Sequence, residues 1–263
     1  MRALRLHPPG GIENLRLDEV EPPQPRPGLA LVRVHAAAIT RDELTWPTDR
    51  LPAIPSHELS GVVVDDSDGL SAGEEVFALT PFDRDGVAAD FALVPVEALA
   101  PKPRSLRHVQ AAAVPMPWLT AWQGLMVHGR LRPGERVRVT GGHGGVGHLA
   151  MQLARSRGAV LVDEGEPCDL LFDTAGGDAL ARSASRAGRV VTITAETPGA
   201  RYFVVEPNRE QLLEVTRLVD TGELRPEIDS IFPLAEARQA FVRSAARGKH
   251  GKVVLRVVDE QPL

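Results

Sequence analysis

The sequence predicts an α/β protein built of two parts that differ in texture. In the first hundred residues, short runs of alternating apolar residues, such as 30–35 and 75–79, are separated by polar turns. Short strands at this spacing are typical of a compact β-barrel or sandwich. From residue 111 onward, strand-like runs alternate with stretches of helical periodicity, which indicates a parallel sheet with crossover helices.

Composition limits the classes of function. The 263 residues are 43% hydrophobic and 25% charged, as in an ordinary folded protein, and the net charge of −5 argues against a nucleic-acid partner. The apolar runs are short and the N-terminus lacks the core of a signal peptide, so we expect a cytoplasmic protein with no membrane partner and a small-molecule substrate. The single cysteine, Cys168, rules out an intramolecular disulfide and a cysteine-rich metal cluster.

The expected elements follow the change in periodicity. Residues 111–128 are helix-like but are interrupted by Pro115 and Pro117, which predicts two short helices. Strands are predicted at 30–35, 61–64, 75–79, 90–94, 135–140, 169–173, 189–193, 201–205 and 251–257. Further helices are predicted at 148–157, 208–221 and 234–247.

A glycine-rich turn joins the strand at 135–140 to the helix that follows it. Gly142, Gly144 and Gly147 fit the G-x-G-x-x-G spacing that lets a backbone approach a pyrophosphate at a helix N-terminus. The strand and helix on either side make the pattern more specific than the glycines alone. The other interpretation is a turn that serves only helix–strand packing. His143 and His148 beside the turn are interpreted as phosphate contacts or as caps.

Several segments together resemble the zinc-free quinone-reductase branch of the medium-chain dehydrogenase/reductase superfamily. Residues 140–154 are similar to the cofactor loop of that family, and 34–42 and 51–62 to its active-site and barrel segments. Residues 113–124 are similar to its interdomain hinge helix. The remaining matches are 172–177, 203–207 and 251–255, so the resemblance covers nearly the whole chain.

This resemblance implies a GroES-like β-barrel catalytic domain (1–112 and 233–263) and a Rossmann-type parallel-sheet nucleotide-binding domain (113–232). It implies reduction of a quinone, an enone or another activated double bond by NADPH or NADH, and a homodimer formed through the edge of the parallel sheet. Zinc should be absent, because zinc-dependent relatives need cysteine ligands that this chain lacks. His57 and Glu58 alone do not fill a tetrahedral site.

The chain departs from the family after the first helix of the parallel-sheet domain. Residues 159–162 lead through the polar stretch 163–167 directly into the strand at 169–173. A parallel crossover needs about a dozen residues, so at least one βα unit is missing and the domain is shortened. Asp163 and Glu164 stand where NADP-specific relatives carry groups for the 2′-phosphate, and an acidic residue there suits the ribose hydroxyls of NAD.

Candidate site residues fall into two groups. We expect Thr40 to donate to a substrate carbonyl or a ribose, and Asp42 to be a catalytic carboxylate or a helix-start residue. Trp46 is interpreted as an aromatic wall for a flat substrate or as core packing. By resemblance, the cofactor is bound by Thr120, Gly144, Gly145, Val146, Thr174, Ala175, Thr194, Phe203, Val205 and Lys252.

Three functions remain open at this point. The glycine turn and the nicotinamide-side motifs favour an NAD(P)H-dependent reductase that works without zinc. The missing βα unit favours a cofactor-free isomerase, cyclase or lyase of secondary metabolism that uses the same cleft, or a non-catalytic binding protein. Fold alone does not separate the three.

Overall fold

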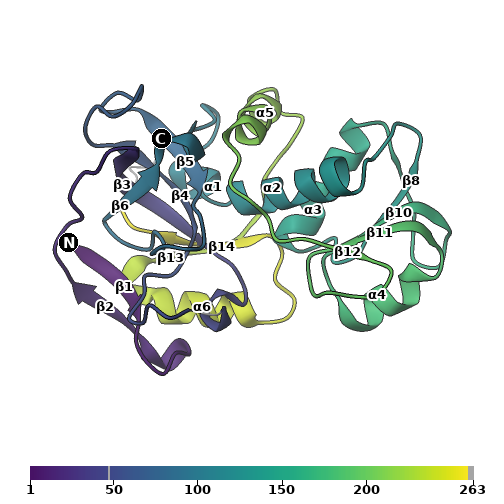
Figure 1. Cartoon of the computed structure of the whole chain (residues 1–263), viewed down its shortest axis with the longest axis horizontal. Coiled ribbons are helices and arrows are strands. Elements are labelled where there is room, and N and C mark those ends of the chain that lie inside the picture. Colours follow the sequence, from purple (N-terminus) through teal and green to yellow (C-terminus); the bar gives the residue numbers. More distant parts are fainter. Residues whose placement is uncertain (47, 260–263) are drawn as a thin grey trace.

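The computed structural model describes residues 1–46 and 48–259, and the chain forms two lobes side by side along its longest axis (Figure 1). The main sheet of the first lobe consists of β3 (Leu29–Ile39), β4 (Glu58–Val63), β5 (Glu75–Leu79), β6 (Phe91–Pro95), β7 (Ala100–Pro101), β13 (Ile228–Pro233) and β14 (Lys252–Arg256). The strand order is β13-β14-β3-β4-β5-β7, with β6 paired to β3. A separate hairpin, β1 (Arg2–Leu6) with β2 (Leu15–Glu19), lies at the outer end of this lobe (Figure 1).

The long strand β3 shows how the sequence positions the site. Its first half alternates between buried and less buried residues, as expected for a strand with one core face. The register shifts between Val34 and Ala36, and from there to Ile39 every residue is buried. Strand β14 pairs with this buried half. Thr40, which follows the last residue of β3, therefore lies at the junction between the lobes.

The second lobe is an all-parallel sheet of five short strands. Its members are β8 (Arg136–Val139), β9 (Val160–Leu161), β10 (Cys168–Asp173), β11 (Ala187–Thr192) and β12 (Arg201–Tyr202), in the order β12-β11-β10-β8-β9. Helices α3 (Gly145–Ser156) and α4 (Gly177–Ala184) cover opposite faces. Leu170 and Phe172 of β10 pack in the cluster that contains α3, whereas Leu171 between them packs with α4.

The parallel sheet lacks a unit of the usual doubly wound arrangement. In the common order 3-2-1-4-5-6, three strands precede the switch point and three follow it. Here β8, β10, β11 and β12 correspond to strands 1, 4, 5 and 6, and β9 to strand 2, but strand 3 is absent from the sheet. Residues 162–167 instead pass from β9 directly to β10 on the other side of β8. The shortening that the sequence predicts is confirmed.

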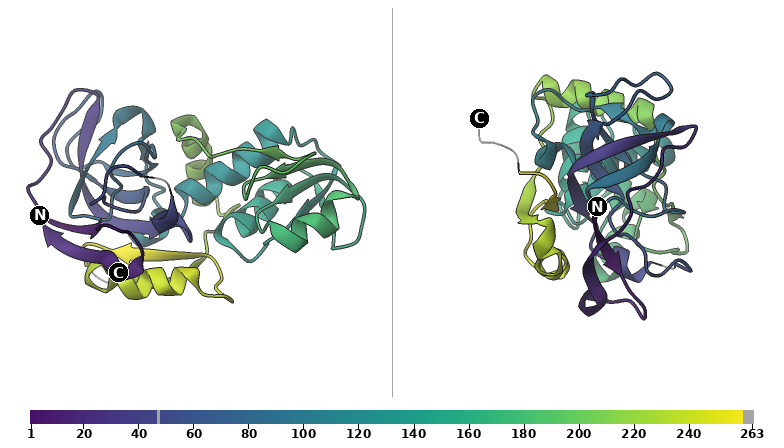
Figure 2. Two further views of the ribbon diagram at one scale, coloured as in Figure 1. Left: turned by 60° about the horizontal axis from the view of Figure 1, so that its bottom comes forward. Right: turned by 90° about the vertical axis from the view of Figure 1, so that its left-hand side faces the viewer.

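Helices fill the junction between the lobes. The short α1 (His108–Ala111) is followed by α2 (Pro115–Trp122), which continues as a π-helical turn at Gln123–His128. Pro115 and Pro117 lie in the first turn of α2, where missing N–H groups cost nothing, so the interruption falls before them. Phe77 and Leu79 of β5 belong to the same apolar cluster as α2, α3 and α5 (Arg209–Asp220), so one core joins the two lobes. Figure 2 shows helices between the two lobes.

Several boundaries differ from those expected from the sequence. Strand β13 begins at Ile228 and pairs with β14, so residues 228–232 lie in the sheet of the first lobe, and helix α6 (Ala237–Ala245) forms the crossover. Strand β12 ends at Tyr202, three residues early. Within the described residues, no helix is long and apolar enough to cross a membrane.

Candidate active site

The glycine turn has the geometry of an anion cradle. Gly144 is the N-cap residue of α3 and forms a parallel β-bridge with Gly251. The structure gives no acceptor within residues 1–46 and 48–259 for the N–H groups of Val146 and Gly147. Gly141 has a φ of 68° and bends the chain back beneath the helix. A Cβ atom on Gly147 would lie 2.2 Å from the carbonyl oxygen of Gly141. The third glycine is thus required for close packing, and the helix N-terminus presents free N–H groups to a phosphate.

The ring of His148 holds this turn in place through two hydrogen bonds. Its Nδ1 lies 3.0 Å from the carbonyl oxygen of Gly144, and its Nε2 accepts the N–H of Glu227 at 3.2 Å. A ring that donates through Nδ1 and accepts through Nε2 is neutral. His148 therefore links the start of α3 to the chain at Glu227 through its ring, and it makes no side-chain cap bond to the helix. The N–H of Gly251 also donates to the carbonyl of His143 at 3.2 Å, which ties the turn to the start of β14.

A buried carboxylate shapes the loop on the other side of the turn. Asp173 is fully buried and accepts hydrogen bonds from the hydroxyls of Thr140 (2.5 Å) and Thr192 (2.8 Å) and from the N–H of Gly176 (3.0 Å). The hydroxyl of Thr194 also donates to it, at 3.2 Å. The carboxyl ends of β8, β10 and β11 are thereby locked together. Sequence reasoning passed over Asp173 as part of a motif, although a buried acid at three strand ends is an organising group.

The expected nicotinamide-side residues lie around this rim. The hydroxyl of Thr174 donates to the carbonyl of Thr140 at 2.7 Å, whereas Ala175 and Thr194 are exposed. Thr120 is buried, and its hydroxyl donates within α2 to the carbonyl of Met116 at 2.6 Å. Phe203 packs on the ring of His128 with centroids 4.4 Å apart, and Val205 is half-buried beside the same core. Their contacts with a cofactor stay predictions.

A cluster of buried ionisable groups faces the turn from the first lobe. Lys252, the first residue of β14, forms an ion pair with Glu58, and both side chains are buried. The Lys252 ammonium also donates to the hydroxyl of Thr40 at 3.3 Å. Glu58 accepts a second hydrogen bond from the N–H of Met116 at 3.0 Å. A Cβ atom on Gly145 would lie 3.0 Å from Cδ of Lys252, so the lysine stem runs directly past the anion cradle.

A second carboxylate, Glu43, completes the cluster. It accepts the N–H of Thr40 at 3.2 Å and the hydroxyl of Ser56 at 3.4 Å. Burial raises the pKa of Glu43 to about 8, and the nearby Lys252 ammonium lowers it only in part. Burial also raises the pKa of Glu58, opposed by its ion pair with Lys252. At neutral pH, Glu43 therefore holds a proton a few ångströms from Thr40. Sequence reasoning missed Glu43 and Ser56.

An aromatic group lies beside the cluster. The ring of Trp46 stacks on His57 with centroids 6.0 Å apart and meets the edge of Phe82 at 5.2 Å. Burial lowers the pKa of His57 to about 4, so the ring is neutral, and its Nδ1 lies 3.1 Å from the hydroxyl of Thr80.

Asp42 is exposed, and its side chain makes no cap bond to the 3₁₀ turn Glu43–Thr45. The structure thus places Asp42 outside the cluster.

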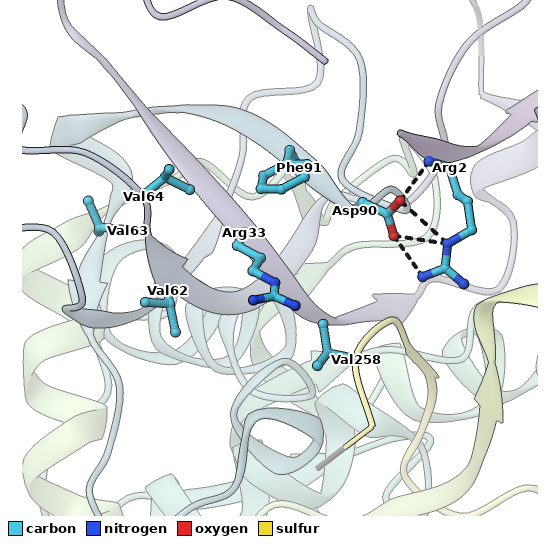
Figure 3. Close-up of a pocket in the computed structure, with 8 residues that line it drawn as sticks. All are labelled: Arg2, Arg33, Val62, Val63, Val64, Asp90, Phe91 and Val258. Atoms are coloured by element: carbon cyan, nitrogen blue, oxygen red, sulfur yellow. Dashed lines mark hydrogen bonds and ion pairs between the residues drawn. The ribbon is translucent and has the colours of Figure 1, made fainter. Parts of the chain in front are cut away.

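Two further features concern possible metal ligands and a hollow on the surface. No group of three or more His, Cys, Asp or Glu side chains among the described residues is arranged to hold a metal ion. A hollow of about 520 Å³ lies on the outer side of the first lobe, lined by Arg2, Arg33, Asp90, Phe91 and Val258 among others (Figure 3). Arg2 and Asp90 form an ion pair there, and none of the candidate site residues lines this hollow.

Comparisons with known proteins agree with this geometry. Residues 26–104 match the model of the alcohol dehydrogenase GroES-like domain, and residues 150–255 match a model described as zinc-binding dehydrogenase. A solved alcohol dehydrogenase superfamily protein from Novosphingobium aromaticivorans superposes with a TM-score of 0.87 at 29% identity, over 98% of this chain and all of that one. The chain belongs to the medium-chain dehydrogenase/reductase superfamily. Within it, the chain is similar to proteins named as quinone and alkenal/one oxidoreductases.

Several proteins that are similar to this chain are named as oxidoreductases. A probable zinc-binding oxidoreductase, mitochondrial, from Arthroderma benhamiae is 29% identical over 303 residues, which cover 90% of this chain and 92% of that protein. The NADPH-dependent alkenal/one oxidoreductase, chloroplastic, of Arabidopsis thaliana is 29% identical over 94% of this chain and 77% of its own length. The rat quinone oxidoreductase is 35% identical over 60% of this chain and 50% of its own length.

Proposed function

We propose that this chain is a zinc-independent reductase that uses a reduced nicotinamide dinucleotide to reduce a quinone or a double bond conjugated to a carbonyl group. The observation that carries the proposal is the meeting of the anion cradle at Gly145 with the Lys252–Thr40 pair, from opposite lobes. The names of the Arabidopsis alkenal/one oxidoreductase and the rat quinone oxidoreductase support the reaction class.

The residues fit a nicotinamide dinucleotide. The free N–H groups of Val146 and Gly147 suit its pyrophosphate, and a Cβ atom on Gly145 would make a tight contact of 3.0 Å with the Lys252 side chain. The bound cofactor would supply the hydride, which is the difficult part of the chemistry. The protein must then orient the substrate and stabilise negative charge that develops on its oxygen atom.

Thr40 and Lys252 can provide that stabilisation. The hydroxyl of Thr40 points to the sulfur of Met116 at 3.1 Å and accepts from the Lys252 ammonium on its other side. A substrate oxygen in place of the sulfur would receive a hydrogen bond from a hydroxyl polarised by a cation. Trp46 and Phe82 offer an apolar wall for a flat ring, so the bound substrate lies away from water.

Independence from zinc rests on the chemistry of the available side chains. Thr40 stands at the segment where zinc-dependent relatives need a cysteine, and Cys168 lies in β10 of the other lobe. The carboxylate of Glu58 is engaged by Lys252, and Nδ1 of His57 by Thr80. A zinc ion would find no thiolate and would have to break both contacts.

The direct test is turnover of purified protein with NADH or NADPH and either benzoquinone or methyl vinyl ketone, followed by loss of the reduced-nicotinamide absorbance. We expect turnover that withstands prolonged chelator treatment. The shortened parallel sheet favours the second candidate, a cofactor-free isomerase or lyase. Absence of binding of either dinucleotide at millimolar concentration would exclude the reductase and leave that candidate.

A further inference from the structure

The two halves of the parallel sheet differ in their number of strands. Dinucleotide-binding sheets consist of two halves, each of which holds one mononucleotide. The half that follows the switch point is present as β10, α4, β11 and β12. The other half ends with β9, a strand of two residues whose Val160 is 51% exposed. No strand lies beyond β9 in the described chain to form the wall that would hold adenosine.

The loop that replaces the missing unit also engages the nearby cations. Glu164 pairs with Arg138 of β8 at 3.5 Å and with Arg182 of α4 at 2.7 Å. Glu166 pairs with Arg136 at 3.0 Å, and Arg186 donates to the carbonyl of Gly165. Four guanidinium groups that could otherwise bind a phosphate thus form ion pairs or hydrogen bonds with residues 164–166 and hold this loop against the sheet.

One acidic side chain at this end is not engaged in the same way. Asp163 follows β9 about 20 residues after the glycine turn, where an acidic residue meets the ribose hydroxyls in dinucleotide folds. It is exposed, and no ion pair to its carboxylate is formed within residues 1–46 and 48–259. Its charge would repel a 2′-phosphate and would accept hydrogen bonds from a 2′-hydroxyl.

We infer that the chain recognises its cofactor mainly through the nicotinamide mononucleotide half, so that reduced nicotinamide mononucleotide binds nearly as tightly as NADH, and NADPH binds more weakly than NADH. The inference rests on the proposed function and specifies its cofactor. The 5′-phosphate of the mononucleotide meets the start of α3, where the N–H groups of Val146 and Gly147 have no acceptor among the described residues. The adenosine half meets the edge at β9, where contacts are few.

Calorimetric titration of the full chain with three probes tests this inference without turnover. We expect the Kd values of NADH and reduced nicotinamide mononucleotide to agree within about tenfold, and that of NADPH to exceed that of NADH by about tenfold or more. A mononucleotide more than about tenfold weaker than NADH, or NADPH as tight as NADH, would overturn the inference alone. No binding of any probe would overturn the proposed function as well.

Two variants test whether Asp163 is the residue that discriminates NADH from NADPH. Asp163→Asn removes the charge from an exposed side chain, and we expect it to narrow the NADH-to-NADPH ratio of Kd values at least about threefold. Glu210→Gln, an exposed carboxylate on α5, is the matched control and should leave the ratio unchanged. An unchanged ratio in Asp163→Asn would show that Asp163 does not face the ribose and would overturn its assigned role.

Discussion

Three ionisable groups buried at the junction between the lobes determine how the site behaves. Lys252 and Glu58 neutralise each other, and Glu43 is left as the third ionisable group in a space with little water. Taking a charge out of water costs several kcal/mol unless a partner compensates for it. The proposed site is therefore coupled to stability, and substitutions in it act on both activity and folding.

Removal of the lysine should show this coupling. Lys252→Met leaves Glu58 buried without its cation, and we expect the free energy of unfolding to fall by about 3–5 kcal/mol. The double variant Glu58→Gln, Lys252→Met removes both charges and should recover at least half of that loss. Denaturant unfolding at neutral pH measures both. If the single and double variants lose the same stability, the pair is not the buried ion pair described here.

Glu43 gives the folded protein a distinctive pH dependence. Its pKa of about 8 exceeds the ordinary value of 4.5, so the folded state binds a proton that the unfolded state releases between those two pH values. Its contribution to stability is therefore complete below pH 4.5 and is lost as the pH rises toward 8. We expect the wild type to lose up to roughly 1.4 kcal/mol per pH unit relative to Glu43→Gln in this window. Urea unfolding of both proteins at several pH values checks this; a difference that does not vary with pH would contradict it.

The sequence revealed only the part of this site that local motifs mark. Thr40 and Lys252 lie in segments with a recognisable pattern, and the structure brings them together. Glu43 lies in a run of polar residues that reads as surface, and only the packing of the 3₁₀ turn against Ser56 buries it. Burial of a short polar segment depends on distant chain segments, so periodicity does not report it.

At the scale of elements, the turn before α3 depends on one close contact. Gly147→Ala would put a methyl group 2.2 Å from the carbonyl oxygen of Gly141, so α3 must move away from β8. We expect a loss of about 1–3 kcal/mol in stability and a marked loss of NADH binding. Gly142→Ala is the matched control, because its Cβ meets only the flexible end of Met151, at 3.0 Å. Thermal unfolding and calorimetry compare them; equal effects would argue against the packing role of Gly147.

The elements that sequence reasoning found share a strong local signal. Strands β8, β10 and β11 and helix α3 have apolar runs of clear period, and the short link after β9 predicted the missing unit. Strand β13 was not expected, because its residues are only half-buried and it pairs through a crossover with β14. The N-terminal hairpin β1–β2 was missed for a similar reason, since β2 is mostly exposed. Strands with exposed or half-buried residues carry a weak alternating pattern, so the sequence alone does not mark them.

At the scale of the whole molecule, both ends of the parallel sheet are open. Val204 beside β12 is 58% exposed and Val160 of β9 is 51% exposed. Unpaired strand edges invite pairing, and a twofold axis beside one edge satisfies both copies at once. The family resemblance implies a homodimer through an edge of the parallel sheet, and we expect the β12 edge to form it. The β9 edge is unlike that of relatives, because the unit that would cover it is missing.

These two edges provide a matched pair of substitutions. A lysine in place of Val204 would bring two like charges together across a twofold interface at β12, whereas a lysine in place of Val160 would lie at the other end of the sheet. We expect the wild type and Val160→Lys to scatter light as dimers at micromolar concentration, and Val204→Lys to scatter as a monomer. A monomeric wild type would remove the homodimer altogether. Dissociation by Val160→Lys alone would place the interface at β9, where the chain lost its third strand.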